Sequence, residues 1–437
     1  MKQKLILIFI FIIIATSTAC NKQSNKNDLS TNNNLLEDLK TEFDNLSKNK
    51  ISEVYAESDD LASQVDRDVI NLINRFAFDL YKELEKDDEK NIFISPYSIS
   101  SALTMLYNGA DTTTKEEIAK VLHYDETSMD DINETYKNLM ISLLRADADV
   151  KINVANSTWI RDTFKPKENY IDVLEDYFFS EVYTKDFNNS NTVDEINQWI
   201  SNATDDMISK MINEINIDTV MYLINAIYFK GDWTKQFDEN RTKKEDFFSI
   251  DKTTEVDMMH QFEEFDFFQN DELIGVELPY GRERISMYAF VPQNDNNDIE
   301  TIISNLDYDK FNEMFGNFRE YENVEVKFPK FKVDYGVKEL KNSLKSLGME
   351  ESFTNDADLT KIENDLFVSS VSHKAVIEVN EKGSEAAAAT VVDITTESMP
   401  IEDEFKPVFI ADQPFFFVIR DNYTGVILFM GKIGDLE

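Results

Sequence analysis

Apolar side chains recur at helical spacing in three parts of the chain. The first part covers residues 73–84, and the second covers residues 98–107, directly after Ser95-Pro96. The second part predicts a helix from about Ser98 to Tyr107. The third part, residues 340–347, is followed by Gly348, and glycine is common just beyond a helix C-terminus.

Other segments show the two-residue alternation that is typical of strands. We interpret residues 285–291 and 324–328 in this way. Near the end of the chain, residues 415–419 and 426–430 flank a turn that ends at Gly425, which predicts a hairpin. Helical patterns come mainly first and strand patterns mainly later, without a fixed repeat. This order favours one α+β domain, beginning close to Val65, over repeated βαβ units.

The N-terminus has the pattern of an export signal. Lys2 and Lys4 precede ten apolar residues, 5–14, and small side chains then lead to Cys20, which is the only cysteine. Such an apolar run is too short to cross a bilayer comfortably. We therefore expect residues 1–20 to be a lipoprotein-type signal ending at a lipidated Cys20, followed by a polar flexible spacer over residues 21–64. The alternative is an ordinary cleaved signal and a secreted protein.

The charge of the chain restricts its partners. The sequence has 84 acidic and 44 basic residues among 437, which gives a net charge of −40. Nucleic acids and heparin-like polymers are themselves anionic, so neither is an expected partner. A partner that carries basic groups is favoured instead. With one cysteine, no disulfide can form within the chain.

The sequence contains no pattern of a catalytic or metal site. It has three histidines but no HExxH pair, and it has no GxSxG elbow, GxGxxG turn or GxxxxGK[ST] loop. Cys20 is assigned to the export region, so a cysteine nucleophile is not expected. We predict that the protein is not an enzyme and that it needs no cofactor or metal.

The segment EKGSEAAAATVVDITTESMP, residues 381–400, is unusual for a connection within a compact domain. Seven small or acidic residues are followed by strand-forming side chains. In an extended conformation, small side chains would occupy one face, at Ser384, Ala386, Ala388 and Thr390. Side chains of this size could enter between existing strands without overpacking them. An exposed alanine-rich linker or a short helix is the alternative.

The stretch EKGSEAAAAT resembles the hinge of the serpin family, the segment that inserts into the central sheet after cleavage. Six further stretches resemble the family in the same order. They are NIFISPYSISSAL (91–103), INQWISNAT (196–204), LINAIYFKGDW (223–233), LPYGRERISM (278–287), FPKF (328–331) and ADQPFFFVIRDNYTGVILFMGKI (411–433). The resemblance extends from about Val65 to the C-terminus.

The resemblance implies a serpin domain over residues 65–437, with a large central mixed sheet, smaller sheets and about eight to nine helices. It also implies an exposed reactive-centre loop at about 381–404. The hinge residues would be Glu381, Gly383, Ser384, Glu385, Ala386, Ala387, Ala388, Ala389 and Thr390. The polar group of the sheet-opening region would be Ser95, Ser98, Asn197, Asn225 and His373, with Trp233 where the loop first enters.

The activity that the resemblance implies is irreversible inhibition of serine or cysteine proteases. The protease would cleave the loop and form an acyl-enzyme, and the freed hinge would insert as a strand before deacylation. The family's spacing from Glu381 places the reactive bond at Glu397–Ser398, which suits a protease pocket lined by Arg or Lys. A bond at Thr396 or Ile394 would suit an elastase-like enzyme, and Asp393 a caspase-like one.

Two other functions stay open at this point. The chain could be a non-inhibitory serpin that acts as a binding or carrier module, or a structural surface lipoprotein. The expected partners of the inhibitor are a target protease, bound covalently, and a membrane, bound through the N-terminal lipid. We expect a monomer.

Overall fold

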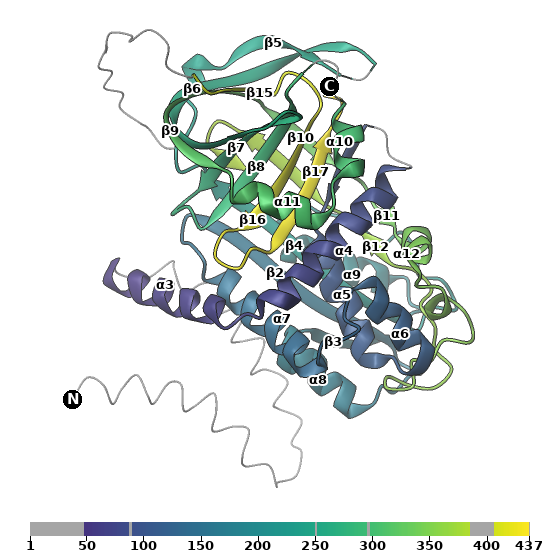
Figure 1. The fold of residues 1–437 in the computed structure, drawn as a ribbon. Helices are drawn as coiled ribbons and strands as arrows, with labels where there is room; N and C mark the ends of the chain where they lie inside the picture. The colour runs from purple at the N-terminus through teal and green to yellow at the C-terminus, as the bar shows by residue number, and fades with distance from the viewer. Residues whose placement is uncertain (1–47, 87–89, 250, 295–297, 385–405, 437) are drawn as a thin grey trace, which may run out of the picture.

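The computed structural model describes residues 48–86, 90–249, 251–294, 298–384 and 406–436. Within these ranges it has an α+β fold with ten α-helices, slightly more than the eight to nine expected, and three sheets (Figure 1). No helix in these ranges is both long and apolar enough to cross a membrane. The helices are α3 (Lys48–Ser63), α4 (Arg67–Glu85), α5 (Pro96–Gly109), α6 (Thr112–Val121), α7 (Met129–Leu144), α8 (Glu168–Phe178), α9 (Asn191–Ala203), α10 (Ile299–Asn305), α11 (Tyr308–Phe315) and α12 (Lys341–Leu347).

The three helices predicted from spacing are α4, α5 and α12; α5 begins at Pro96, two residues before the predicted start, and the predicted glycine follows α12. The Ser95 side chain accepts a hydrogen bond from the backbone N–H of Ser98 at the start of α5. Gly348 follows α12 with a φ of +115°, a left-handed conformation that glycine adopts without strain. Local capping chemistry therefore determines where these helices begin and end.

Helix α3 differs from the expectation. Residues 21–64 are expected to be a flexible spacer, but from Lys48 onward the chain forms a helix that packs on α7. Val54, Ser58 and Ala62, spaced four residues apart, are buried. The face is narrow and partly polar, so the helix shows little of the apolar periodicity from which packed helices are predicted.

Two large mixed sheets form the body of the molecule. The nine-stranded sheet lies at the top of Figure 1, and helices α5 to α8 gather at the bottom. Its strands are β1 (Asn91–Ile94), β5 (Lys243–Phe248), β6 (Thr253–Gln269), β7 (Leu273–Tyr280), β8 (Ile285–Pro292), β9 (Arg319–Pro329), β15 (Val408–Ile410), β16 (Phe415–Asp421) and β17 (Ile427–Ile433). The predicted C-terminal hairpin is confirmed as β16 and β17, which are almost wholly buried.

The six-stranded sheet positions the candidate site. Its order is β10 (Phe331–Asp334), β13 (Val376–Asn380), β14 (Gly383–Ser384), β4 (Met221–Asp232), β2 (Val150–Arg161) and β3 (Glu181–Lys185). A third, two-stranded sheet joins β11 (Lys338–Glu339) to β12 (Ser372–His373).

One edge of β4 is largely unpaired. On one side, β4 pairs with β2 from Met221 to Gly231. On the other side, within the described residues, it pairs only with the two residues of β14, at Gly231 and Asp232. Strands β13 and β4 are therefore joined at the top by β14 and separated below it. This separation, which we call the sheet gap, leaves the edge of β4 available for a further strand.

Candidate functional site

The top of the sheet gap is closed by the turn at residues 380–384, where the sequence analysis places the start of the hinge. Gly383 is required here because a Cβ at this position would lie 2.0 Å from the carbonyl oxygen of Gly231 in β4. Ser384, the last described residue before position 406, is buried, and its hydroxyl lies 2.8 Å from the hydroxyl of Tyr280. The hinge thus enters the sheet between β13 and β4, with its first small side chain facing the core.

Trp233, which the resemblance assigns to the place where the loop first enters, contacts this turn. Its ring is buried and stacks on Tyr280 with the centroids 4.3 Å apart. The indole N–H donates to the carbonyl of Asn380 at 2.9 Å, and the backbone N–H of Trp233 donates to Lys382. The tryptophan therefore holds both arms of the turn against the end of β4.

Glu381 is the acidic residue of the turn, and it is buried. Burial alone would raise the pKa of its carboxyl, but hydrogen bonds from Lys330 and Thr242 outweigh this effect and lower the pKa below its ordinary value. The Lys330 ammonium lies 2.9 Å from one carboxylate oxygen, and the Thr242 hydroxyl donates to the other at 2.8 Å. Lys330 and Thr242 could not be predicted as partners from the sequence, because neither lies near Glu381 in the chain.

Below the turn, four of the five predicted polar residues lie together. His373 Nε2 accepts a hydrogen bond from the backbone N–H of Ser95 at 3.1 Å, and the Ser98 hydroxyl donates to the carbonyl of Asn225. Burial lowers the pKa of His373 to about 4, so the ring is neutral at pH 7. Since Nε2 accepts, the ring proton is on Nδ1.

Asn197 and Asn156 change the composition of this polar group. The Asn197 side chain holds the backbone of Met211 and Ile212 instead, accepting from both N–H groups and donating to the carbonyl of Ile212. Asn156 in β2 takes its place beside Asn225 and accepts from the Asn225 amide at 2.7 Å. An asparagine amid the buried positions of β2 is the sequence signal that could have identified it.

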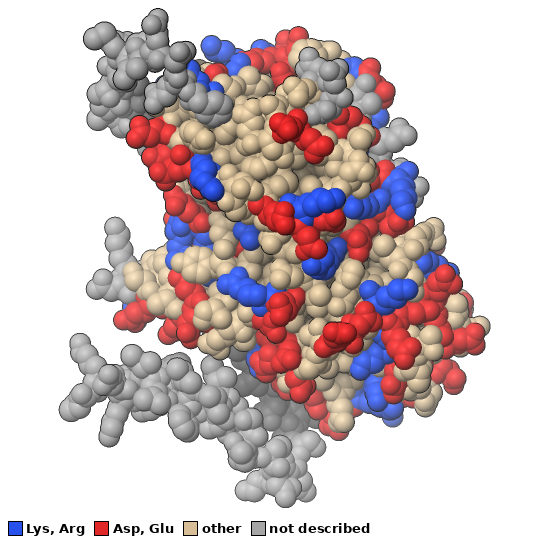
Figure 2. Space-filling view, in the orientation of Figure 1, with Lys and Arg blue, Asp and Glu red and all other residues tan. Residues whose placement is uncertain are grey.

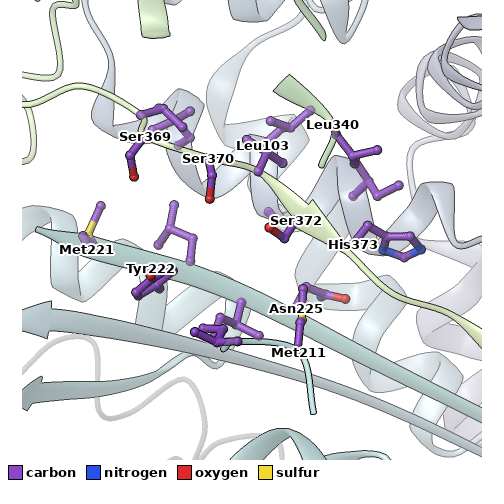
Figure 3. A pocket seen from close by; sticks show the side chains of 18 of the residues that line it. Leu103, Met211, Met221, Tyr222, Asn225, Leu340, Ser369, Ser370, Ser372 and His373 are labelled. Carbon is purple, nitrogen blue, oxygen red and sulfur yellow. The ribbon is translucent and has the colours of Figure 1, made fainter. Parts of the chain in front are cut away.

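A cavity of about 110 Å³ lies within the sheet gap. One wall is β4 from Met221 to Asn225, the opposite wall is the segment from Leu366 to His373, and Leu103 of α5 contributes to the lining (Figure 3). The lining is mainly apolar, with serine hydroxyls along the edge at positions 369, 370 and 372. Asn225 Oδ1 is buried there without a hydrogen-bond partner in the described structure. Within the described residues, this buried acceptor therefore lies beside a cavity with a polar edge, where a further hydrogen-bond donor could bind.

The remaining hinge and bond residues lie outside the described residues. These are Glu385, Ala386, Ala387, Ala388, Ala389, Thr390, Asp393, Ile394, Thr396, Glu397 and Ser398, and the description resumes at Lys406. The two ends of this segment are nevertheless placed. It leaves the six-stranded sheet at Ser384 and returns beside β15, which runs parallel to β9 in the nine-stranded sheet.

A family model described as serpin (serine protease inhibitor) matches residues 71–436. The chain belongs to the serpin family. It is 36% identical to an uncharacterized serpin-like protein of Thermococcus kodakarensis, over 84% of this chain and 86% of that protein. This confirms the serpin fold and the resemblance on which the expected fold was based.

Two solved serpin structures are also similar. The native state of tengpin, a thermophilic serpin, has a TM-score of 0.78 and 32% identity, covering 85% of this chain and 95% of its own. Human thyroxine-binding globulin complexed with thyroxine has a TM-score of 0.76 and 27% identity, covering 84% and 98%. Serpins in general inhibit proteases and are not enzymes, so a target protease is the expected class of partner. The second structure shows that the same fold can carry a small molecule.

Proposed function

We propose that this serpin is an irreversible suicide-substrate inhibitor of serine proteases whose hinge inserts into the sheet gap after cleavage at Glu397–Ser398. The observation that carries the proposal is the sheet gap itself. Its top is already occupied by Gly383 and Ser384, while the edge of β4 below them is unpaired in the described structure. The start of the hinge is thus seated where the rest of it would enter.

The register of β14 predicts where each inserted residue would lie. Ser384 pairs with Gly231 on β4 and with Val379 on β13, in both cases antiparallel. Six positions further along the loop is Thr390, which would lie opposite Asn225 on one side and His373 on the other. Ile394 would lie opposite Met221, the first residue of β4.

The faces of the inserted strand also fit the gap. Alternate residues of a strand point the same way, so Ala386, Ala388 and Thr390 would share the core-facing side of Ser384. Continuing this face, Val392 and Ile394 would reach the cavity beside Leu103. A hydroxyl at Thr390 could donate to Asn225 Oδ1. Ten residues, each gaining about 1 kcal/mol in ladder hydrogen bonds, would favour insertion by on the order of ten kcal/mol before burial is counted.

The length of β4 bears on the position of the reactive bond. A residue held in the protease active site cannot at the same time be hydrogen-bonded to β4 as part of the inserted strand. The pairing of the inserted strand with β4 would extend to Ile394. Cleavage at Glu397–Ser398 leaves three residues between the end of the strand and the attached protease. Cleavage at Asp393 or Ile394 would shorten the inserted strand, which makes the caspase-like target and one of the elastase-like alternatives less favourable. Thr396 stays compatible with this length.

The proposed target has a basic primary pocket, which would bind the Glu397 carboxylate. The net charge of −40 agrees with a basic partner, and acidic side chains are spread over the face in Figure 2, most densely over its lower, helical half. We further propose that residues 1–20 are the export signal, that Cys20 is lipidated and anchors a monomer to the membrane, and that residues 65–437 are the inhibitory domain. A secreted form is the alternative.

The test is to mix the protein with a glutamyl-specific serine protease and to look for a complex that survives denaturant on a gel. Mass spectrometry of the same mixture locates the cut. We expect cleavage after Glu397, a 1:1 covalent complex, and a cleaved protein that melts at a higher temperature than the intact one. Cleavage without a complex and without added heat resistance would instead support a carrier module, the function suggested by the thyroxine-bound relative.

A further inference from the structure

Helix α3 lies entirely before the segment that matches the serpin family, yet it makes dense contacts with the domain. It packs on α7, to the lower left in Figure 1. The Ser58 hydroxyl donates to the carbonyl of Ser142 at 2.7 Å, and the Ser142 hydroxyl donates back to the carbonyl of Ser58 at 3.1 Å. Reciprocal buried hydrogen bonds of this kind fix the helix in one position and register.

Two acidic side chains of α3 contact arginines of the domain. Asp59 accepts from Arg282 at 2.7 Å and from Arg284 at 3.3 Å, and Glu57 accepts from Arg145 at 2.8 Å. Arg284 is the largest fully buried side chain in the described residues. Its other carboxylate partner is the buried Asp421. A buried guanidinium needs hydrogen-bond partners for most of its N–H groups. Asp421 alone does not supply enough of them for Arg284, and α3 supplies others.

The turn that carries Arg282 also contacts the residues around the hinge. The backbone N–H of Gly281 donates to the carbonyl of Asp232 at the end of β4, and the Thr234 hydroxyl donates to the carbonyl of Gly281. Next to Gly281 is Tyr280, which stacks on Trp233 and hydrogen-bonds Ser384. Between Asp59 and Ser384 there is therefore one short turn, residues 280–282.

This turn is also held from the side of α7. The Asp147 carboxylate accepts from the backbone N–H of Arg282 at 2.6 Å, and the Tyr55 hydroxyl of α3 lies 3.5 Å from the same carboxylate. The Arg282 guanidinium lies over the Tyr55 ring, 4.2 Å from its centroid. Tyr55 and Asp59, one helical turn apart, thus enclose Arg282 between them.

We infer that α3 is a clamp on the sheet gap. By fixing Arg282 it holds the turn at residues 280–282, and through Tyr280 and Asp232 it keeps the hinge seated at Ser384 without further insertion. Loss of the clamp loosens the top of the gap, so that the uncleaved loop inserts by itself and the inhibitor is inactivated. The predicted insertion of the uncleaved loop and the loss of inhibition rest on the proposed function. The predicted loosening of the hinge when α3 is perturbed does not.

The experiment compares Asp59→Asn with Asp60→Asn in the full chain. Both variants remove one negative charge from α3, but Asp60 is exposed and its carboxylate accepts a hydrogen bond from Gln64, in the segment that follows α3. Hydrogen exchange is measured for the amides of Trp233 and of residues 380–384. Inhibitory activity and the melting temperature of the uncleaved chain are followed during incubation at 37 °C.

We expect Asp59→Asn to exchange these amides about tenfold faster than the parent, since a hydrogen bond to a charged group contributes enough to shift an opening equilibrium by that factor. It should also lose activity faster and accumulate an intact, heat-resistant form. Asp60→Asn should match the parent. Equal exchange in the two variants, or loss of activity through unfolding and aggregation, would overturn the clamp. If the parent never inhibits but Asp59→Asn still exchanges faster, the proposed function fails and the coupling stands.

Discussion

The sharpest test of the insertion register is Thr390→Arg. In the register extended from β14, position 390 lies between Asn225 and His373 on the core-facing side of the inserted strand. His373 is neutral and buried there, and no carboxylate is among the residues that line the cavity. An arginine at this position would have to lose its hydration without gaining a counter-charge.

The size of the effect follows from a competition between two rates. Burying an unpaired charge costs at least several kcal/mol. If only about 3 kcal/mol of this cost enters the barrier to insertion, insertion slows on the order of 100-fold. Deacylation of the protease is unaffected, so it would be completed before the strand is inserted. The variant should therefore be cleaved and released as an ordinary substrate.

Ala387→Arg is the matched control. It introduces the same charge three positions earlier, on the opposite face, where the register places it across from Tyr228. The Tyr228 ring lies beneath the ammonium of Lys151, which is half exposed and pairs with the exposed Asp205. An arginine there can keep contact with water and a carboxylate. The assay is a titration of protease with inhibitor, with complexes counted on a denaturing gel. Complex formation at parental yield by Thr390→Arg, or equal loss in both variants, refutes the register.

Three further outcomes follow from single residues. Glu397→Ala should abolish complex formation with a glutamyl-specific protease, measured on the same gel, and unchanged inhibition would move the reactive bond elsewhere. Burial raises the pKa of Glu85 to about 7, so the free energy of unfolding should fall as the pH rises from about 4.5 to 7, because the folded state binds this proton more tightly than the unfolded chain. Glu85→Gln should remove that slope from urea unfolding curves recorded at pH 5 and pH 8; a retained slope contradicts the assignment. His373→Ala should leave the Ser95 N–H unsatisfied and lower the stability of the intact protein by about 1–3 kcal/mol in thermal unfolding. A melting temperature equal to that of the parent would show that the bond contributes little.

The parts of the fold that the sequence predicted are those encoded locally. Ser95 caps α5, Gly348 ends α12, and the alternation near the C-terminus forms the β16–β17 hairpin. Each of these depends on residues within a few positions of one another. The unpaired edge of β4 could not be predicted in this way. Within the described residues this edge has few partners because β13 lies apart from it, and β13 is more than 140 positions further along the chain.

The same distinction applies to the candidate site. Ser95, Ser98, Asn225 and His373 were assigned through a resemblance, and the structure places them together, whereas Asn197 holds another segment. The ion pair of Glu381 with Lys330 joins residues 51 positions apart, and the sequence around either residue does not predict the pairing. Helix α3 was missed because polar contacts, rather than an apolar stripe, hold much of it to the domain.

Two packing defects of the described structure lie in the sheet gap. A cavity of about 110 Å³ corresponds to roughly 2–3 kcal/mol of lost packing, and the buried Asn225 acceptor has no partner in the described structure. In the proposed mechanism an inserted strand removes both defects, because its side chains fill the cavity and its donors reach the asparagine. A substitution that fills the cavity would therefore stabilise the intact form alone and slow insertion. A core substitution between β16 and β17 would change the stability of the intact form and of the cleaved, inserted form by similar amounts. The free-energy difference between the two forms would then stay the same. The free energy available for trapping a protease thus depends on the few residues that line the gap, and much less on the stability of the domain as a whole.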